Sequence, residues 1–428
     1  MNHNDNTGVN VMLKRVKLLL ASAACALAIG QPAFAAGEPV KIAGIYDLSK
    51  VYTFISPQIA QGATDYINLV NSRGGVEGHP VIYSVGDHGN EPQRGIEGYE
   101  KFKREGYVLF DFLSSPVSRA VLPRAMKDGN PMLQTFVGRA DAVDGDVFNW
   151  IFPMAPTYWG QAANIVKFIE DQAGGDAKGK KVAFLYLDYA FGQEPIPILK
   201  ALAEKKGFDL QLFPYPLPGT DQASAWTGIR RYKPDWVVHW SFAGLHVIAS
   251  KQMKRNKIPM SKFISVNWIN EVDLKNIGHE RAKGLKRSEP VVAGREPVII
   301  QEILNELYAK GKGSGDVDNV GQTYYNTGVA IYAIALEGIR NAVKSGASFP
   351  LTPAAVKEGM ESIQGFDVHG LMPPVNLSSS NHGGDGKTRI SEWDGEKWVP
   401  LTDWFVADSD LVWQEVKKHS AEYVKSGK

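Results

Sequence analysis

The chain has 428 residues, of which 44% are hydrophobic and 22% charged, and 47 Lys and Arg residues nearly balance 46 Asp and Glu residues. This length suggests two domains with substantial cores, and the balanced charge argues against nucleic acid or an anionic membrane as a partner. The one cysteine, Cys25, lies in an N-terminal apolar run, so cleavage after that run would exclude disulfides, thiol catalysis and cysteine-bound metals.

The N-terminal residues 1–35 are predicted to be a secretory signal peptide. A basic segment at 12–17 precedes an apolar segment at 18–29, and Ala33-Phe34-Ala35 offers small residues for cleavage. The apolar segment is shorter than the ~20 residues that cross a bilayer. We therefore expect cleavage near Ala35 and release of the mature chain into the periplasm.

Alternating strand and helix patterns predict a first α/β lobe. Val40–Tyr46 has the pattern of a strand, and a helix follows between the Ser56-Pro57 start signal and the Gly74-Gly75 stop signal. The alternation continues with strands at 81–85, 107–112 and 131–136 and helices at 91–104 and 116–128. Such alternation is typical of parallel sheets covered by helices.

A second α/β lobe is predicted after 153–156, where the same rhythm starts again. Helices are expected from Tyr158 and Gly192, and strands at 181–187, near Leu210, at 235–240 and at 263–266. Further helices are expected at 297–309 and 321–344, and a hairpin at 388–398 around Asp394-Gly395. The predicted fold class is therefore α/β, with two Rossmann-like lobes whose sheets are mainly parallel.

Motifs for catalysis or metal binding fail on their spacing. The segment 381–388 approaches a phosphate-binding loop, but Asn381 stands where the first glycine is required. His279-Glu280 has no second histidine at helical spacing, and the acidic segment 316–319 lacks the glycine and distal glutamate of a calcium loop. We therefore expect a binding protein with no enzymatic activity, no cofactor and no metal.

Polar and aromatic residues follow several predicted strands, where ligands bind in open parallel sheets. Ser114-Ser115-Pro116 would place hydroxyl groups at a positive helix start, which suits a carboxylate, although an ordinary helix cap has the same residues. Aromatic residues gather at the other strand ends, as expected of the wall of a cleft. The residues predicted from this pattern are Thr135, Phe136, Tyr189, Phe191, Trp240 and Trp268.

Over nearly all of the mature chain, the sequence resembles the type I periplasmic solute-binding proteins of ABC importers, in the branch of the leucine/isoleucine/valine-binding proteins. The Gly-Ala to Gly-Gly-x-x-Gly stretch within 61–78 is the most specific of the shared features. The others are Val40-Lys-Ile-Ala-Gly, Ser114-Ser115-Pro116, Asp188-Tyr-Ala-Phe-Gly192 and the helix around 325–338.

The resemblance implies two lobes joined by a three-crossing hinge, one of 36–156 with 288–366 and the other of 157–287 with 367–428. Ser114 and Ser115 would hold a ligand carboxylate together with Thr135 and the backbone near Phe136. Tyr189 and Phe191 would close over the ligand from the second lobe, and Glu271, or a nearby residue of 267–270, would bind its amino group. The implied function is that of a monomeric binding subunit, which delivers a branched-chain amino acid or similar small carboxylate to a membrane permease.

Two departures keep other ligands open. The first loop, 47–52, lacks the proline- and glycine-rich form usual in this branch, and Trp240 and Trp268 are bulkier than a pocket for valine or leucine needs. An aromatic carboxylate or an amide is therefore an alternative ligand. A periplasmic sensory module that presents the same fold to a receptor is an alternative function.

Overall fold

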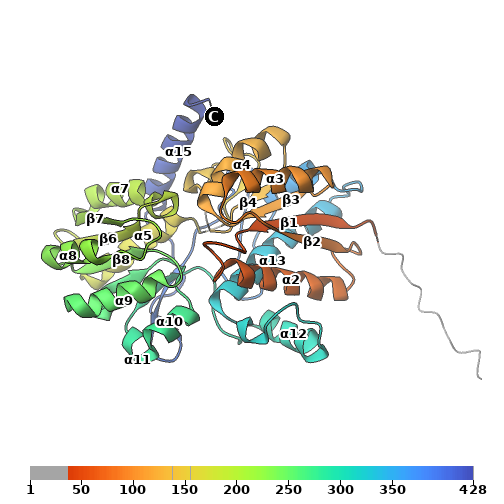
Figure 1. The fold of residues 1–428 in the computed structure, drawn as a ribbon. Coiled ribbons are helices and arrows are strands. Elements are labelled where there is room, and N and C mark those ends of the chain that lie inside the picture. The colour runs from red at the N-terminus through yellow and green to blue at the C-terminus, as the bar shows by residue number, and fades with distance from the viewer. Residues whose placement is uncertain (1–36, 137, 155, 428) are drawn as a thin grey trace, which may run out of the picture. The chain divides into compact units, whose positions relative to one another are not determined.

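Two β-sheets organise residues 37–136, 138–154 and 156–427, which are the residues that the computed structural model describes (Figure 1). The predicted signal peptide and Cys25 lie outside these described residues. The first sheet has five parallel strands in the order β2-β1-β3-β4-β5. Its strands are β1 (Val40–Tyr46), β2 (Val81–Asp87), β3 (Leu109–Phe112), β4 (Met132–Leu133) and β5 (Ile151–Phe152).

The second sheet has seven strands in the order β12-β11-β10-β9-β8-β6-β7. The strands from β6 to β10 pair in parallel, whereas β11 pairs antiparallel with both β10 and β12. The strands are β6 (Lys181–Leu187), β7 (Asp209–Tyr215), β8 (Trp236–Trp240), β9 (Phe263–Ser265), β10 (Lys286–Glu289), β11 (Arg389–Trp393) and β12 (Trp398–Pro400). The predicted α/β class with two mainly parallel sheets is confirmed, and β11 and β12 form the predicted hairpin.

Helices cover both faces of the first sheet because its strands are apolar on both sides. Along β1, Ala43 and Ile45 pack into one core, and Ile42 and Tyr46 pack into another. In Figure 1, α3 and α4 lie over one face of this sheet, and α2 and α13 lie over the other. The helices of this part are α2 (Ser56–Ser72), α3 (Pro92–Arg104), α4 (Ser115–Asp128), α12 (Val298–Glu306), α13 (Thr323–Lys344) and α14 (Pro353–Glu361).

The second sheet has its own helices, and the last helix of the chain contacts elements from both parts. That helix, α15 (Ser409–Lys425), packs on α5, on α7 and on the 3-10 turn η1 (Ala140–Val143). The other helices are α5 (Tyr158–Gln172), α6 (Ala190–Gln193), α7 (Ile196–Lys206), α8 (Ala223–Tyr232), α9 (Leu245–Asn256), α10 (Glu271–Ile277) and α11 (His279–Ala282). None of the described helices is both long enough and apolar enough to cross a membrane.

The chain passes between the two sheets three times: between β5 and β6, between β10 and α12, and between α14 and β11. In the second passage the chain returns to the first sheet, because α13 packs against that sheet. The hydroxyl oxygens of Tyr332 on α13 and Tyr46 on β1 are 2.8 Å apart. Strand β10 of the second sheet ends at Glu289, two residues beyond 287, where the predicted segment 157–287 of the second lobe ends. The exact residue boundaries of the lobes stay a prediction.

Two glycines let α2 and α13 pack closely on each other. A Cβ atom on Gly62 would lie 2.1 Å from the Tyr325 carbonyl oxygen, and one on Gly328 would lie 2.2 Å from the Ile59 carbonyl oxygen. Both distances are far below van der Waals contact with backbone atoms, which are held by the helices. These glycines therefore attach α13, from late in the sequence, to the first helix of the described chain.

The strand predicted at 131–136 is shorter in the structure, where β4 contains only Met132 and Leu133. Phe136 has a φ of 51°, a left-handed backbone conformation that a strand does not accommodate. The chain therefore leaves the sheet before Phe136 and turns toward η1. The helix predicted to be capped by Ser56 instead has Ile55 at its cap position, with no side-chain cap bond.

Candidate ligand-binding site

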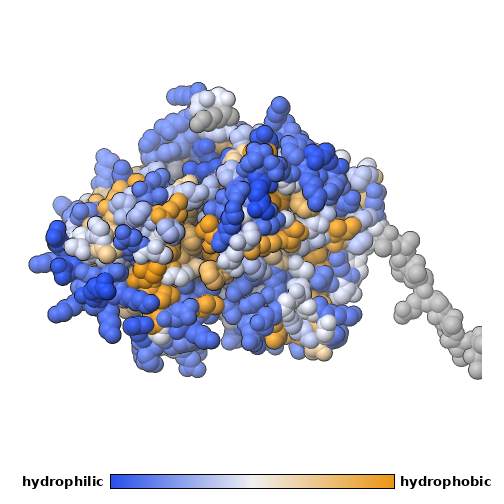
Figure 2. Space-filling view, viewed as in Figure 1, coloured by the Kyte–Doolittle hydropathy of each residue, from blue (hydrophilic) through white to orange (hydrophobic). Residues whose placement is uncertain are grey.

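A cavity with about 280 Å³ of empty space lies between residues that follow the first sheet and residues that follow the second. Its lining residues are Tyr52, Ile55, Leu113, Ser114, Ser115, Tyr158, Phe191, Phe242 and Trp268. Five of these nine side chains are aromatic, two are aliphatic and two are serines. Figure 2 shows hydrophobic residues gathered along the middle of the viewed face, over the region between the two sheets.

The lining residues come from the carboxyl ends of parallel strands, where an open α/β sheet leaves a crevice. Tyr52 and Ile55 lie between β1 and α2, and Leu113 and Ser114 lie between β3 and α4. Phe191, Phe242 and Trp268 follow β6, β8 and β9 of the second sheet, respectively, and Tyr158 begins α5.

The two serines at the start of α4 have different hydrogen-bonding roles. The Ser114 hydroxyl donates to Asn90 Oδ1 at 2.7 Å, so its proton is already used within the protein. Ser115 Oγ accepts the Gly138 N–H at 3.3 Å, and no acceptor for its hydroxyl proton lies among the described residues. Ser115 therefore has a proton to donate to a ligand, next to a helix N-terminus that favours negative charge.

The aromatic wall is held together by ring contacts and one polar contact. The Trp268 indole N–H donates to the Tyr158 hydroxyl oxygen at 2.6 Å. The ring centroids of Tyr158 and Phe191 are 5.3 Å apart, those of Phe191 and Phe242 are 5.7 Å apart, and those of Tyr52 and Phe242 are 5.1 Å apart, all edge-on. Because Tyr52 follows β1 of the first sheet and Phe242 follows β8 of the second, their contact joins the two parts at the cavity wall.

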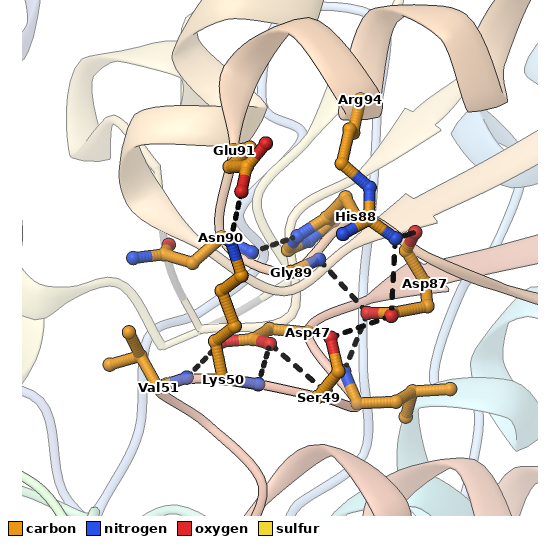
Figure 3. Close-up of polar contacts among 11 residues, drawn as sticks. Asp47, Ser49, Lys50, Val51, Asp87, His88, Gly89, Asn90, Glu91 and Arg94 are labelled. Carbon is orange, nitrogen blue, oxygen red and sulfur yellow. Dashed lines mark hydrogen bonds and ion pairs between the residues drawn. The ribbon is translucent and has the colours of Figure 1, made fainter.

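Two buried or half-buried carboxylates fix the loop that carries Tyr52 (Figure 3). Asp47 accepts the backbone N–H groups of four successive residues, from Ser49 to Tyr52. Asp87 accepts the Leu48 N–H and the Ser49 hydroxyl from the same loop. Although partial burial opposes ionisation, these bonds lower the pKa of Asp87 to about 2, so the carboxylate stays charged. These bonds hold the loop that carries Tyr52 against the end of the first sheet.

The loop that follows β2 holds Ser114 through a hydrogen bond from the Ser114 hydroxyl group to Asn90. His88 is fully buried, and its Nδ1 accepts the Asn90 N–H at 2.9 Å (Figure 3). This bond helps to hold Asn90 with a φ of 56°, from which the Asn90 amide oxygen reaches Ser114. Burial lowers the pKa of His88 to about 4, so this histidine is neutral at physiological pH.

The predicted site residues divide into two groups. Ser114, Ser115, Phe191 and Trp268 line the cavity, as the predicted site requires. The others, Thr135, Phe136, Tyr189, Trp240 and Glu271, are not among the lining residues. The roles of all nine residues in ligand binding stay predictions.

Residues of the second group mostly lie one layer behind the cavity. Thr135 donates its hydroxyl proton to Asp111 at 2.8 Å, and Phe136 packs edge-on against Trp268 with centroids 6.4 Å apart. Trp240 is fully buried and lies 5.4 Å from Tyr158, centroid to centroid. Tyr189 is half-buried at the start of α6, where burial raises its pKa. Phe136 and Trp240 therefore contact residues of the aromatic wall without lining the cavity.

Glu271 has both carboxylate oxygens engaged away from the cavity. One oxygen accepts the Thr323 hydroxyl proton at 2.7 Å, and the other accepts the Thr323 N–H at 3.1 Å. Glu271 therefore caps the N-terminus of α13 and lines a separate surface groove with Arg295 and Trp398.

Five lining residues were not predicted as site residues: Tyr52, Ile55, Leu113, Tyr158 and Phe242. Phe242 carried a usable signal, because it lies beyond the end of β8, whereas Trp240 is the last residue within that strand. Leu113 also follows its strand directly, whereas Tyr52 comes six residues after the end of β1. Tyr158 had no such signal, since it begins a helix after a passage between the sheets.

The two-sheet α/β fold and the apolar cavity between the sheets define a binding protein of the type that encloses a small ligand. A family model described as "Periplasmic binding protein" matches residues 39–397. The chain belongs to this periplasmic binding protein family. Membership confirms the expectation of a binding protein in place of an enzyme.

Solved structures from several bacteria have the same fold. A structure described as an ABC transporter permease from the Pseudomonas fluorescens group is 31% identical, with a TM-score of 0.84 over 91% of this chain and 97% of that one. A branched-chain amino acid ABC transporter from Thermus thermophilus with bound valine is 19% identical, with a TM-score of 0.76 over 88% and 98%. A fatty acid ABC transporter substrate-binding protein from Thermomonospora curvata is 20% identical, with a TM-score of 0.71 over 88% and 94%.

Among curated relatives, the Leu/Ile/Val-binding protein homolog 8 of Brucella suis is 25% identical over 245 residues. That match covers 56% of this chain and 60% of the relative, so the chain spans about three-fifths of the length of the curated relatives it matches. At this identity, the relative supports the family and leaves the ligand open.

Proposed function

We propose that this protein is the periplasmic substrate-binding subunit of an ABC importer and that it encloses a small carboxylate-bearing solute between its two sheets. The single observation that carries the proposal is the cavity between the strand ends, which has a proton-donating serine beside the start of α4. Similar structures are named as ABC transporter components with amino acid or fatty acid ligands. The protein would act as a monomer and pass its ligand to a membrane permease.

A carboxylate suits the part of the cavity lined by the start of α4 for a physical reason. The Ser115 hydroxyl proton and the N-terminal end of α4 both favour negative charge, and no lining side chain is itself acidic. Both ligand classes expected from the sequence, branched-chain amino acids and aromatic carboxylates, carry such a group.

Ligand binding should also draw the two sheet-bearing parts together, because lining residues come from both. We would strip the mature protein of ligand by unfolding and refolding, and then screen carboxylates by thermal shift and calorimetry. A true ligand at ~100 times its dissociation constant raises stability by about 2.7 kcal/mol. Small-angle X-ray scattering should show a smaller radius of gyration with ligand. A protein that binds no carboxylate and does not contract would contradict the proposal.

Ser115→Ala tests the carboxylate anchor directly. Loss of one hydrogen bond to a charged group should weaken binding by about 1.5–3 kcal/mol, which is roughly ten- to hundredfold in dissociation constant. Ser118→Ala is the matched control, since Ser118 is buried on the same turn of α4 and donates to the Ser115 carbonyl without lining the cavity. Equal affinities for Ser115→Ala and the unmodified protein would remove Ser115 from the site.

A further inference from the structure

We infer that the cavity selects a carboxylate with an aromatic or other apolar body and no ammonium group. This inference rests on the proposed function and names the ligand class of the same site. It begins from the chemistry of the nine lining side chains, among which there is no Asp, Glu, Lys, Arg or His. The ligand is therefore recognised by neutral donors and apolar surface.

An α-amino acid would bring an ammonium group into this closed, apolar space. A buried charge needs a partner of opposite charge or several good acceptors, and without them its burial is unfavourable. The cavity wall offers no carboxylate for that purpose. An amino acid would therefore bind less well than the same molecule without its ammonium group.

Of three carboxylates outside the cavity lining, Glu271 and Asp111 have their oxygens engaged by other residues. Both oxygens of Glu271 accept hydrogen bonds from Thr323, as described above. Asp111 accepts the hydroxyl protons of Thr135 and Tyr46 in a fully buried cluster behind the wall. Glu194 accepts the Ala140 N–H with Oε1, and its Oε2 has no partner among the described residues, but Glu194 is not among the residues that line the cavity.

A carboxylate, in contrast, finds two proton donors. The Ser115 hydroxyl group is one, and the Tyr158 hydroxyl group is the other. Tyr158 uses its oxygen to accept the Trp268 N–H, and no acceptor for its own proton lies among the described residues. Hydroxyl protons that lack an acceptor within the protein favour an anionic ligand over a cationic one.

The body of the ligand is defined by the rings around it. Five of the nine side chains that line the cavity are aromatic, and pockets for partly apolar ligands are lined mainly by such side chains. Tyr52 and Phe242, and likewise Tyr158 and Phe191, contact each other edge-on, and an aromatic ligand ring can join such a cluster through its face or its edge. A small aryl carboxylate suits the chemistry of these lining side chains.

The test uses pairs of compounds that differ only in the ammonium group. Calorimetry on the ligand-stripped mature protein would compare 3-phenylpropanoate with phenylalanine, and 4-methylpentanoate with leucine. We expect each carboxylate to bind at least tenfold more tightly than its amino acid, and 3-phenylpropanoate to bind more tightly than 4-methylpentanoate. Tyr158→Phe should weaken 3-phenylpropanoate at least fivefold because it removes a donor.

The other outcomes are decisive. Equal or tighter binding of either amino acid would overturn the inference and leave the proposed carboxylate capture intact. If Glu194→Gln or Glu271→Gln then abolished amino acid binding, that acid would be the ammonium partner. Absence of binding in both series would overturn this inference, and a wider screen without any carboxylate ligand would overturn the proposed function as well.

Discussion

Glu194 is a buried carboxyl group whose ionisation should make the protein less stable at alkaline pH. Its side chain is 7% exposed, at the end of α6, and its Oε1 accepts the Ala140 N–H at 2.8 Å. Its Oε2 is buried and has no hydrogen-bond partner among the described residues. The charged groups around it are Arg119 on α4, Arg139 at the start of η1 and Asp141 within η1.

Burial is the main cause of the altered ionisation of Glu194 and raises its pKa from 4.5 to about 7, despite the two nearby arginines. A change of this size corresponds to about 3 kcal/mol. The folded state binds the proton more tightly than the unfolded state, so its contribution to stability is complete below pH 4.5. The contribution is lost as the pH rises through 7.

Glu194→Gln keeps the shape and the oxygen that accepts the Ala140 N–H, but it cannot ionise. We expect the variant and the unmodified protein to have similar stability near pH 4.5, and the variant to be more stable by about 3 kcal/mol at pH 8. Urea unfolding followed by tryptophan fluorescence at both pH values measures this difference. Glu204→Gln, at an exposed position on α7, is the control. A stability difference for Glu194→Gln that did not change between the two pH values would refute the reasoning.

Three further predictions concern packing and buried charge. Gly62→Ala should lower the free energy of unfolding by about 1–3 kcal/mol, because its Cβ would meet the backbone of α13. Gly160→Ala is the control: no atom lies within 3.6 Å of its Cβ, so thermal unfolding should show unchanged or raised stability. Arg287→Met should lower the free energy of urea unfolding by about 3 kcal/mol or more, because the buried Glu289 loses an ion-pair partner. The Arg287 guanidinium lies 2.6 Å from the Glu289 carboxylate. A smaller loss would mean that Arg389, the other partner of Glu289, compensates. Burial lowers the pKa of His88 from 6.5 to about 4, so the free energy of unfolding should fall by up to about 3 kcal/mol as the pH drops from 6.5 to 4. In His88→Asn this decrease should be smaller. An unchanged pH profile of stability in the variant would contradict the role of His88.

Most of the fold could be predicted from the sequence because it depends on local patterns. The start of α5 at Tyr158, the strand Lys181–Leu187 and the hairpin of β11 and β12 lie where apolar periodicity and turn residues predict them. The error at 131–136 has a local cause too, since the left-handed φ of Phe136 has no signature in an apolar run.

The site was predictable only where the rule of strand ends applies. Ser114, Ser115, Phe191 and Trp268 follow strands and line the cavity. The same rule selected Thr135, but its hydroxyl proton is donated to Asp111 on the neighbouring strand. Sequence spacing shows that a residue follows a strand, and it does not show which neighbour will take its hydrogen bond.

The sequence by itself therefore determined the class of the protein: alternating strands and helices, apolar segments suited to two parallel sheets, and polar and aromatic residues at the strand ends. Only the tertiary structure decided which of those residues meet. Glu271 caps α13, 52 residues later in the chain, because Thr323 lies beside it, and Tyr158 joins the wall because Trp268, 110 residues away, donates to it. Contacts over such separations depend on how the sheets and their connections pack, and no local pattern in the sequence contains that information.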